Sequence, residues 1–283
     1  MLVTGAGGNL GRRVVELLVE AGASKVIAGT RDPGKVAIAG AETRRVDFSD
    51  PASLEAAFAG VDQVLIISTD VIGEVRQKLQ RAAVDAAVAA GAKHILYTSL
   101  VHPDPDSPVV LAPDHWMTEQ AIAATGIDHT FLRNAIYMDA LLGALGNVVG
   151  SGQWFSAMGR GRIAHITRED CARAAAAALL SGPQGKRILN ISGPQPMTIE
   201  AIAATVSEVF GKPVSVVHVD DAGLVAGMVA AGLPRPVAEL LASFETATRL
   251  GQFDVPSDFE KLTGKPPMSL RDFLEANRAA IAA

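Results

Sequence analysis

Short apolar runs alternate with longer stretches of helical character through the first half of the chain. The runs are rich in Val, Ile, Leu, Thr, Phe and Tyr, and they are apolar rather than alternating. They lie at residues 2–4, 25–30, 43–48, 61–68, 94–100 and 128–134. Such runs are typical of strands that are covered on both faces. The rhythm therefore predicts an α/β fold, with a doubly wound parallel sheet flanked by helices.

The rhythm loosens after about residue 150, where turn-rich pieces separate shorter elements. The patterns there predict helices over 198–210 and 269–283 and a strand within 212–219. We therefore expect a first domain over 1–150 and a smaller α/β lobe over 151–283, interleaved with the first domain near a cleft.

Glycines gather immediately after the first predicted strand, in the stretch TGAGGNLG. Gly5, Gly8 and Gly11 stand three residues apart, and an amphipathic helical pattern begins beside them. A phosphate-binding turn needs a tight turn, a backbone that pyrophosphate can approach, and close packing of helix on strand. The context favours dinucleotide binding over the alternative, a glycine-rich turn without a ligand.

The end of the second predicted strand carries the residues that distinguish NADP(H) from NAD(H). An acidic residue there would accept the ribose 2′-hydroxyl, whereas an arginine would pair with the 2′-phosphate. This chain has Arg31, with Lys35 a turn further on, so we favour NADP(H) over NAD(H). Asp32 could still bind a ribose hydroxyl, which keeps NAD(H) open. Asp47 and Phe48 lie at the end of the third strand and are expected beside the adenine; the alternative is a strand-end cap and a core aromatic.

Composition and charge exclude several classes of protein. The net charge is −5 and the Lys and Arg residues form no block, so no nucleic-acid or membrane-surface partner is expected. No apolar run approaches a membrane span, and glycine at position 5 leaves no room for a signal peptide, which predicts a cytoplasmic protein. The single cysteine, Cys171, excludes an intramolecular disulfide, and the histidines lack metal-ligand spacing. Homodimerisation is left open.

Several motifs in order resemble the NmrA-like atypical short-chain dehydrogenase/reductases. They are TGAGGNLG, the Arg31 position, YTSL, HWMTEQAI, FLRNAIYMD and the ending DFEKLTGKPPMSLRDFLE. Within that group the chain looks most similar to type 2 NAD(P)H:quinone oxidoreductases and triphenylmethane dye reductases. The resemblance implies a Rossmann domain and a small substrate lobe with NAD(P)H between them. It assigns these residues to the cofactor: Gly5, Gly8, Asn9, Leu10 and Arg31. It assigns two segments to the nicotinamide side, Ser68-Thr69 and residues 132–137, the second of which contains Asn134.

The sequence departs from ordinary short-chain dehydrogenases at the catalytic helix. Those enzymes carry a Tyr-x-x-x-Lys pair, in which the tyrosine protonates the developing alkoxide. Here the comparable place reads His115-Trp116-Met117-Thr118-Glu119. Reducing a quinone or a conjugated dye gives a delocalised product that needs less help from an acid, so the missing pair favours aromatic acceptors. The alternative is a protein without catalysis that senses the dinucleotide.

Few residues remain as candidates for the chemistry. His115 could donate a proton, although a lone His on a helix is more often structural. Tyr137 and Asn134 are placed to hydrogen-bond a carbonyl or the carboxamide. Further substrate contacts are expected from residues for which plain packing is the alternative: Tyr97, Ser99, Trp116 and Trp154.

The sequence thus predicts an NAD(P)H-dependent oxidoreductase that transfers hydride directly to a quinone-like or polycyclic aromatic acceptor, without flavin or metal. One alternative is a reductase or oxygenase that tailors aromatic polyketides. Another is a non-catalytic NmrA-like regulator.

Overall fold

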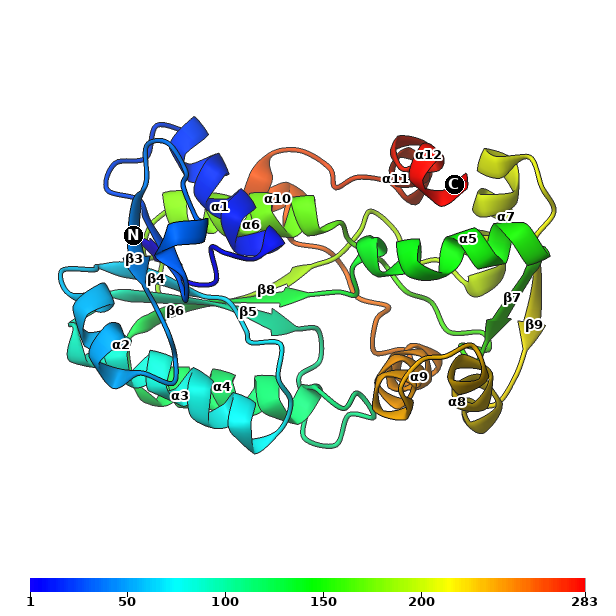
Figure 1. The fold of residues 1–283 in the computed structure, drawn as a ribbon, viewed down its shortest axis with the longest axis horizontal. Helices are drawn as coiled ribbons and strands as arrows, with labels where there is room; N and C mark the ends of the chain where they lie inside the picture. Colours follow the sequence, from blue (N-terminus) through cyan, green and yellow to red (C-terminus); the bar gives the residue numbers. More distant parts are fainter. Residues whose placement is uncertain (283) are drawn as a thin grey trace.

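The computed structural model describes residues 1–282 of the 283-residue chain. A seven-stranded parallel sheet lies between two layers of helices, and a smaller lobe faces the carboxyl ends of its strands (Figure 1). Among the described residues, no helix is both long and apolar enough to cross a membrane.

The sheet has the order β3-β2-β1-β4-β5-β6-β8, and all of its neighbouring strands are parallel. Its strands are β1 (Leu2–Val3), β2 (Ile27–Thr30), β3 (Glu42–Arg45), β4 (Gln63–Ile66), β5 (His94–Leu100), β6 (Asp128–Asn134) and β8 (Lys186–Ile191). The six strands expected from the apolar runs are all present, and the predicted fold class is confirmed. The strand order reverses between β1 and β4: from β1 the chain adds β2 and β3 on one side, then returns to add β4 and the later strands on the other. Such a switch point creates a crevice for ligands at the carboxyl edge.

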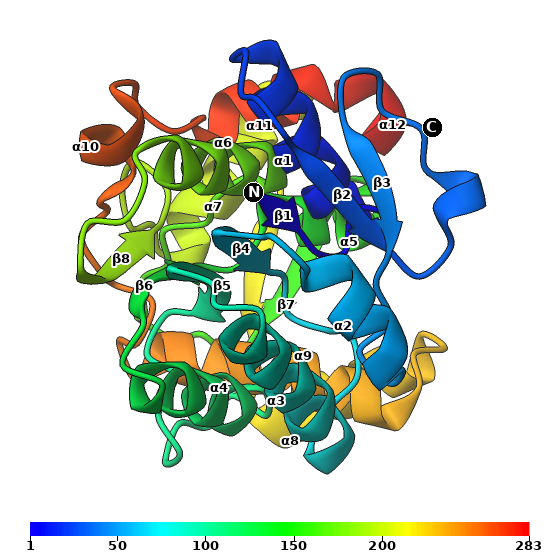
Figure 2. The same ribbon diagram turned by 90° about the vertical axis from the view of Figure 1, so that its left-hand side faces the viewer.

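Two helical layers bury the two faces of the sheet (Figure 2). One layer holds α1 (Asn9–Glu20), α6 (Arg168–Leu180) and α10 (Phe259–Thr263); the other holds α2 (Pro51–Phe58), α3 (Glu74–Ala89) and α4 (Ala112–Ala124). Successive strand residues alternate between the layers: Leu65 packs with the α1 side, whereas Val64 and Ile66 pack with the α2 side. This alternation explains why the central strands read as continuously apolar.

Polar side chains of the types preferred at helix starts cap several helices. Asp50 accepts hydrogen bonds from the backbone N–H groups of Ala52 and Ser53 at the start of α2. Thr167 accepts from the N–H of Asp170 at the start of α6. These caps satisfy donors that the first helical turn leaves unpaired.

The smaller lobe gathers at the right of Figure 1. It contains α5 (Leu142–Ser151), β7 (Gln153–Ser156), α7 (Ile199–Phe210), β9 (Ser215–His218), α8 (Asp221–Ala230), α9 (Arg235–Arg249), α11 (Leu270–Ala276) and α12 (Arg278–Ala282). Strands β7 and β9 form a separate parallel pair. Short 3₁₀ helices occur at Pro33–Lys35 (η1) and Met138–Leu141 (η2).

The predicted helix over 198–210 and the strand within 212–219 are both present. The prediction of a single helix over 269–283 was wrong, because the helix is interrupted at Asn277, between α11 and α12. The Asn277 side-chain amide donates to the carbonyl of Phe273 at 2.8 Å, and its backbone φ of −104° leaves the helical range. Residue 283 lies outside the described range.

The two parts exchange chain segments. Three elements of the larger part come from the second half of the sequence. Strand β8 completes the seven-stranded sheet, helix α6 packs on α1, and helix α10 packs on α6 and β8. Helix α5 ends at Ser151 and lies in the lobe.

Candidate functional site: a cleft at the carboxyl edge of the sheet

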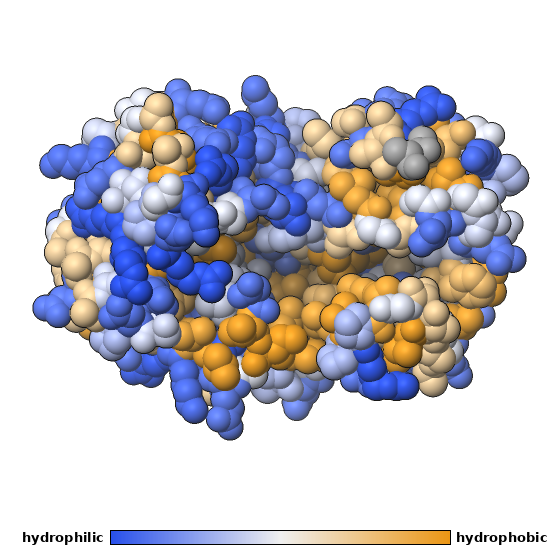
Figure 3. All heavy atoms as spheres, viewed as in Figure 1, coloured by the Kyte–Doolittle hydropathy of each residue, from blue (hydrophilic) through white to orange (hydrophobic). Residues whose placement is uncertain are grey.

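A cleft of about 550 Å³ opens at the carboxyl ends of β1, β2, β3 and β4. The surface is hollowed between the two parts of the molecule, and hydrophobic residues lie along its lower rim (Figure 3). Eight residues that the sequence assigned to a cofactor line the cleft together: Gly5, Gly8, Arg31, Lys35, Asp47, Phe48, Ser68 and Thr69. Sequence reasoning missed further lining residues, among them Gly7, Thr30, Val36, Val46, Ile67 and Val71.

The glycine turn has the geometry that a phosphate site needs. Gly5 has a φ of +67°, a conformation that favours glycine. A Cβ on Gly11 would overlap the carbonyl of Gly5, so this glycine lets helix α1 pack directly on the turn. A Cβ on Gly8 would meet only the Gly5 carbonyl oxygen within 4 Å, at 3.5 Å. Gly7 is a glycine for another reason, since its Cβ would come 2.9 Å from the Thr30 hydroxyl oxygen.

The N-terminus of α1 is open toward this turn. Its cap is Gly8, and no side chain of the described residues caps its first N–H groups. Asn9 is exposed and Leu10 is buried in this first turn, so their backbone amides rather than their side chains are the groups suited to an anion.

The end of β2 presents one unpaired cation. Lys35 forms an ion pair with Asp32, with 3.0 Å between Nζ and Oδ2. A hydrogen bond from Lys35 lowers the pKa of the Asp32 carboxyl and keeps it ionised. Arg31 lines the same cleft and forms no ion pair within residues 1–282. Its guanidinium is therefore available to an anionic ligand.

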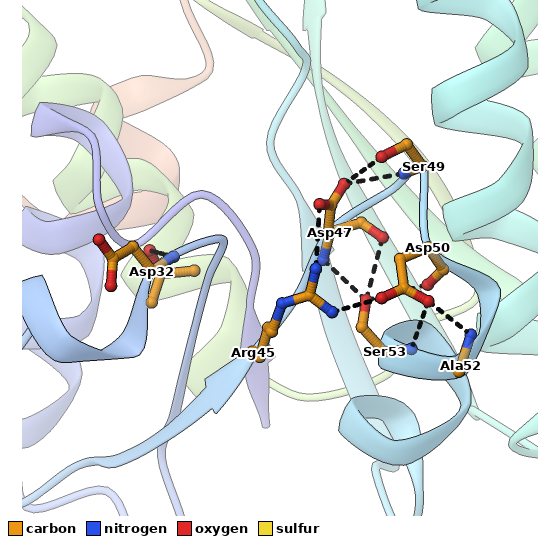
Figure 4. A network of polar contacts seen from close by, with 8 residues as sticks. Asp32, Arg45, Asp47, Ser49, Asp50, Ala52 and Ser53 are labelled. Atoms are coloured by element: carbon orange, nitrogen blue, oxygen red, sulfur yellow. Dashed lines mark hydrogen bonds and ion pairs between the residues drawn. The ribbon is translucent and has the colours of Figure 1, made fainter.

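The end of β3 forms a rigid acidic corner across the cleft from Asp32 (Figure 4). Asp47 accepts from the hydroxyl of Ser49 at 2.6 Å and from its backbone N–H at 3.0 Å, and these bonds lower the pKa of the Asp47 carboxyl. Arg45 bonds to both Asp47 and Asp50. No sequence motif singles out Arg45, whose charge is neutralised within this corner.

Unpartnered polar atoms mark the carboxyl ends of the next strands. They are the Thr69 hydroxyl after β4, the Ser99 hydroxyl on β5, the side-chain oxygen of Asn134 on β6 and the Ser192 hydroxyl after β8. Each is buried and has no hydrogen-bond partner among the described residues. Buried polar atoms normally find partners, so this row fits a bound polar ligand.

Asn134 and Tyr137 lie close together at the end of β6, outside the lining of the 550 Å³ cleft. The Asn134 amide donates to the Tyr137 hydroxyl oxygen at 3.2 Å. Burial raises the pKa of the Tyr137 phenol, and the Arg168 guanidinium lies 5.5 Å from its ring centroid. Tyr137 therefore stays protonated at neutral pH.

His115 and Tyr97 lie in the interior between helices and sheet, and neither lines the cleft. The His115 Nε2 is 2.8 Å from an Arg76 guanidinium nitrogen, and its Nδ1 is 2.9 Å from the Tyr97 hydroxyl. Burial, reinforced by Arg76, holds the pKa of His115 well below its usual range. Sequence reasoning missed Arg76, which belongs to helix α3 and shows no motif.

The two tryptophans predicted as substrate contacts also lie outside the cleft lining. Trp116 is 37% exposed on α4, and Trp154 packs into the hydrophobic core with 9% exposure. A second cavity of about 350 Å³ is lined by Met138, His165 and Met197 among others, and burial lowers the pKa of His165 to about 4. In residues 1–282 no three His, Cys, Asp or Glu side chains are grouped to hold a metal ion.

The sequence pattern of the NmrA-like family matches residues 1–274. The chain belongs to the NmrA-like family. The resemblance drawn from the motifs is thus confirmed, and the chain is an NmrA-like oxidoreductase of the atypical short-chain dehydrogenase/reductase type.

This NmrA-like chain is 35% identical to quinone oxidoreductase 2 of Escherichia coli over 275 residues, which cover 95% of the chain and 96% of that protein. The structure of that NADPH-dependent oxidoreductase with NADPH matches with a TM-score of 0.92 over 97% of this chain and 98% of the other. The Citrobacter sp. triphenylmethane reductase complexed with NADP(H) matches with a TM-score of 0.90 and 35% identity, covering 97% and 99% of the two chains. The NAD(P)H azoreductase of Xenophilus azovorans is 30% identical, over 100% of this chain and 99% of that protein. These relatives support a nicotinamide cofactor and a small-molecule substrate.

Proposed function

We propose that this NAD(P)H reductase transfers hydride to a quinone-like or other flat conjugated acceptor, prefers NADP(H), and needs neither flavin nor metal. The observation that carries the proposal is that the open glycine turn of the cleft lies at the same sheet edge as the strand ends that carry the unpartnered polar atoms of Thr69, Ser99 and Asn134. The relatives named for quinone, dye and azo substrates support the acceptor class.

The residues of the cleft fit a dinucleotide. The open turn at Gly5 and Gly8 and the uncapped start of α1 would hold the pyrophosphate. Asp47 and Phe48 would flank the adenine, and Ser68, Thr69 and Asn134 would hold the nicotinamide side. When bound, NAD(P)H supplies the hydride for the reduction.

NADP(H) is favoured because of the charge balance at the end of β2. Lys35 neutralises Asp32, so the carboxylate that would repel a 2′-phosphate is offset. Arg31 keeps an unpaired guanidinium on the cleft wall, among the described residues. Arginine forms a charge-assisted hydrogen-bonded pair with a phosphate, and NADH has no 2′-phosphate to form it.

Asn134 and Tyr137 would orient the acceptor. The Tyr137 oxygen accepts from Asn134, so the phenolic hydrogen is free to donate to a carbonyl oxygen of the acceptor. Its raised pKa keeps that hydrogen in place. The Asn134 side-chain oxygen is unpartnered and can accept from a hydroxyl or an amide.

A delocalised product suits this site. The tyrosine–lysine pair of ordinary short-chain dehydrogenases is missing, and His115 is buried away from the cleft as a neutral ring. A reduced quinone spreads its negative charge, so a proton from water suffices to complete the reduction, while Tyr137 donates a hydrogen bond.

Turnover of NADPH and NADH with a panel of benzoquinones, naphthoquinones and triphenylmethane dyes tests this function. We expect turnover with at least one class and a higher kcat/KM with NADPH. Oxygen uptake in excess of acceptor-free controls would instead favour an oxygenase that tailors aromatic substrates. NADPH binding without turnover across the whole panel would contradict the proposal and favour a dinucleotide sensor.

A further inference from the structure

The loop after β4 forms one lip of the cleft. Ile67, Ser68, Thr69, Asp70 and Val71 all line the cleft, and Val71 and Ile72 expose apolar side chains. The loop ends at Gly73, where helix α3 begins. Its position decides where the unpartnered Thr69 hydroxyl points.

Arg76 holds this loop from the interior. The residue is only 3% exposed, and one guanidinium nitrogen, Nη1, donates to the carbonyl of Thr69 at 2.8 Å and of Val71 at 3.4 Å. The other terminal nitrogen, Nη2, lies 2.8 Å from Nε2 of His115. No carboxylate among the described residues forms an ion pair with Arg76, so a buried cation is balanced here by neutral acceptors alone.

The Arg76 contact fixes the tautomer of His115. A guanidinium only donates, so the His115 Nε2 must accept and its Nδ1 must carry the hydrogen. That hydrogen is donated to the Tyr97 oxygen at 2.9 Å, and the Tyr97 hydroxyl donates to Gln80 at 3.1 Å. The donors and acceptors are therefore fixed along a directed chain of hydrogen bonds from Arg76 through His115 and Tyr97 to Gln80.

The directed chain ends on helix α4. Gln80 donates to the hydroxyl of Thr118 at 2.8 Å, and Thr118 donates to the carbonyl of Asp114 at 2.9 Å. The Asp114 carboxylate in turn accepts from the backbone N–H of Gly73 at 2.7 Å and from the Gln77 amide at 2.6 Å. The loop is thus anchored at both ends, by Arg76 at Thr69 and by Asp114 at Gly73.

We propose that Arg76 and neutral His115 are positioning residues for the reduction: they set the loop 69–73 so that Thr69 and Val71 align the nicotinamide side of the cleft with the acceptor. His115 then acts as a hydrogen-bond acceptor for Arg76, with no proton of its own delivered to the substrate. The alignment role rests on the proposed function, whereas the anchoring of the loop does not.

Two substitutions at His115 separate positioning from acid catalysis. Gln in place of His offers an amide oxygen that can accept from Arg76, yet it cannot ionise. Leu offers no acceptor and leaves the buried guanidinium short of one partner. We expect His115→Gln to keep kcat within about threefold of the parent and His115→Leu to lower it about tenfold or more, because misplaced groups lose alignment.

Arg76→Met should reproduce the effect of His115→Leu, and the matched control is Arg81→Met on the exposed face of the same helix, where Arg81 pairs with Asp85. The readouts are hydrogen–deuterium exchange of residues 67–73, the dissociation constant of NADPH, and kcat and KM with a quinone that the parent reduces. We expect faster exchange at 67–73 in Arg76→Met and His115→Leu, and parent-like exchange in His115→Gln and Arg81→Met.

Equal loss of kcat in His115→Gln and His115→Leu would overturn the positioning role and return His115 as an acid. Unaltered exchange at 67–73 in Arg76→Met would overturn the anchoring. If the parent reduces none of the acceptors, the proposed function fails, and the exchange and NADPH-binding measurements still decide the anchoring. If Arg76→Met does not fold, the His115→Gln and His115→Leu pair decides it.

Discussion

The two ends of the cleft are built in different ways. The adenosine end comes from one continuous turn at Gly5 and Gly8 and from charged side chains on the exposed ends of β2 and β3. The acceptor end that we propose would be assembled from single polar atoms on four different strand ends, such as Thr69 and Asn134, which are buried without partners among the described residues. In this proposal, cofactor binding depends on a local turn, whereas acceptor recognition depends on several strands of the sheet.

Gly8→Val should disrupt cofactor binding at the adenosine end and should cause the largest loss of NADPH affinity among these variants. The added Cβ has ordinary contact distances, so the fold can accept the side chain, but the branched group would fill the space that the pyrophosphate needs. We expect NADPH affinity to fall by roughly 100-fold or more, about 3 kcal/mol, in calorimetric titration.

Gly11→Ala is the matched control for Gly8→Val. A Cβ at position 11 would overlap the Gly5 carbonyl, so this smaller substitution should lower the melting temperature of the protein itself. A folded Gly8→Val variant with parent-like NADPH affinity would contradict the phosphate-turn assignment.

Arg31→Ala should sharpen the comparison by separating the two cofactors. Only NADPH offers a 2′-phosphate to the unpaired guanidinium, so we expect its dissociation constant to rise about 10- to 100-fold. The NADH constant should change by less than about threefold. Arg45→Ala, which removes an arginine already paired with Asp47 and Asp50, serves as the control. Equal losses with both cofactors would favour Asp32 as a ribose ligand and NAD(H) as the cofactor.

Tyr137→Phe and Asn134→Ala should break the acceptor end. Each removes a hydrogen-bonding group that would hold the acceptor carbonyl or the carboxamide, and we expect kcat with a quinone to fall about tenfold. NADPH affinity should fall less, since the pyrophosphate and adenosine contacts remain. Stopped-flow rates with deuterated NADPH measure the hydride step directly. A loss of NADPH affinity as large as the loss of kcat would place these residues with cofactor binding alone.

The last prediction concerns acid stability, where His165 of the second cavity and Asp47 of the cleft act in different pH windows. Burial lowers the pKa of His165 to about 4, so the unfolded chain binds the extra proton first as the pH falls below 6.5. Its contribution is complete above pH 6.5 and is lost between 6.5 and 4, by at most about 1.4 kcal/mol per pH unit. The Asp47 carboxyl has a lowered pKa, so its contribution is present above the ordinary Asp pKa and is lost only below it.

Thermal unfolding between pH 7 and 3 measures both windows. His165→Phe should flatten the fall in melting temperature between pH 6.5 and 4, and Asp47→Asn should flatten it only below about pH 4. Parallel curves for the parent and His165→Phe would show that His165 stays hydrated and titrates normally.

The sequence predicted the part of the molecule whose information is local. Six strands and the glycine turn follow from runs of a few residues, and Asp50 and Thr167 cap helices as their spacing indicates. Strand β8 was not predicted because it lies at a sheet edge. Ile188 is 53% exposed there, and the run KRILNI is not continuously apolar. The final helix was extended through Asn277 because only the structure shows its side chain bonding back to Phe273.

The interior hydrogen-bond network around Arg76 and His115 was not predicted, for a different reason. Arg76 reads as one more polar residue on an amphipathic helix, and its partner His115 lies 39 positions away. His115 therefore suggested an acid, since nothing in the sequence shows that burial would lower its pKa and engage both ring nitrogens. Residue types indicated that a site exists at the strand ends, but the pairing of its side chains is a property of tertiary packing.

The late position of β8 in the chain bears on how the protein emerges from the ribosome. Until residues 186–191 are available, β6 presents an unpaired edge along Asp128–Asn134, and α1 lacks the cover of α6. A nascent chain that ends near residue 150 would thus expose a strand edge capable of pairing with another copy. The sheet can be completed only once β8 has been synthesised, when α7, α8, α9, α11 and α12 of the lobe are still to come, so the nascent chain carries this unpaired edge until then.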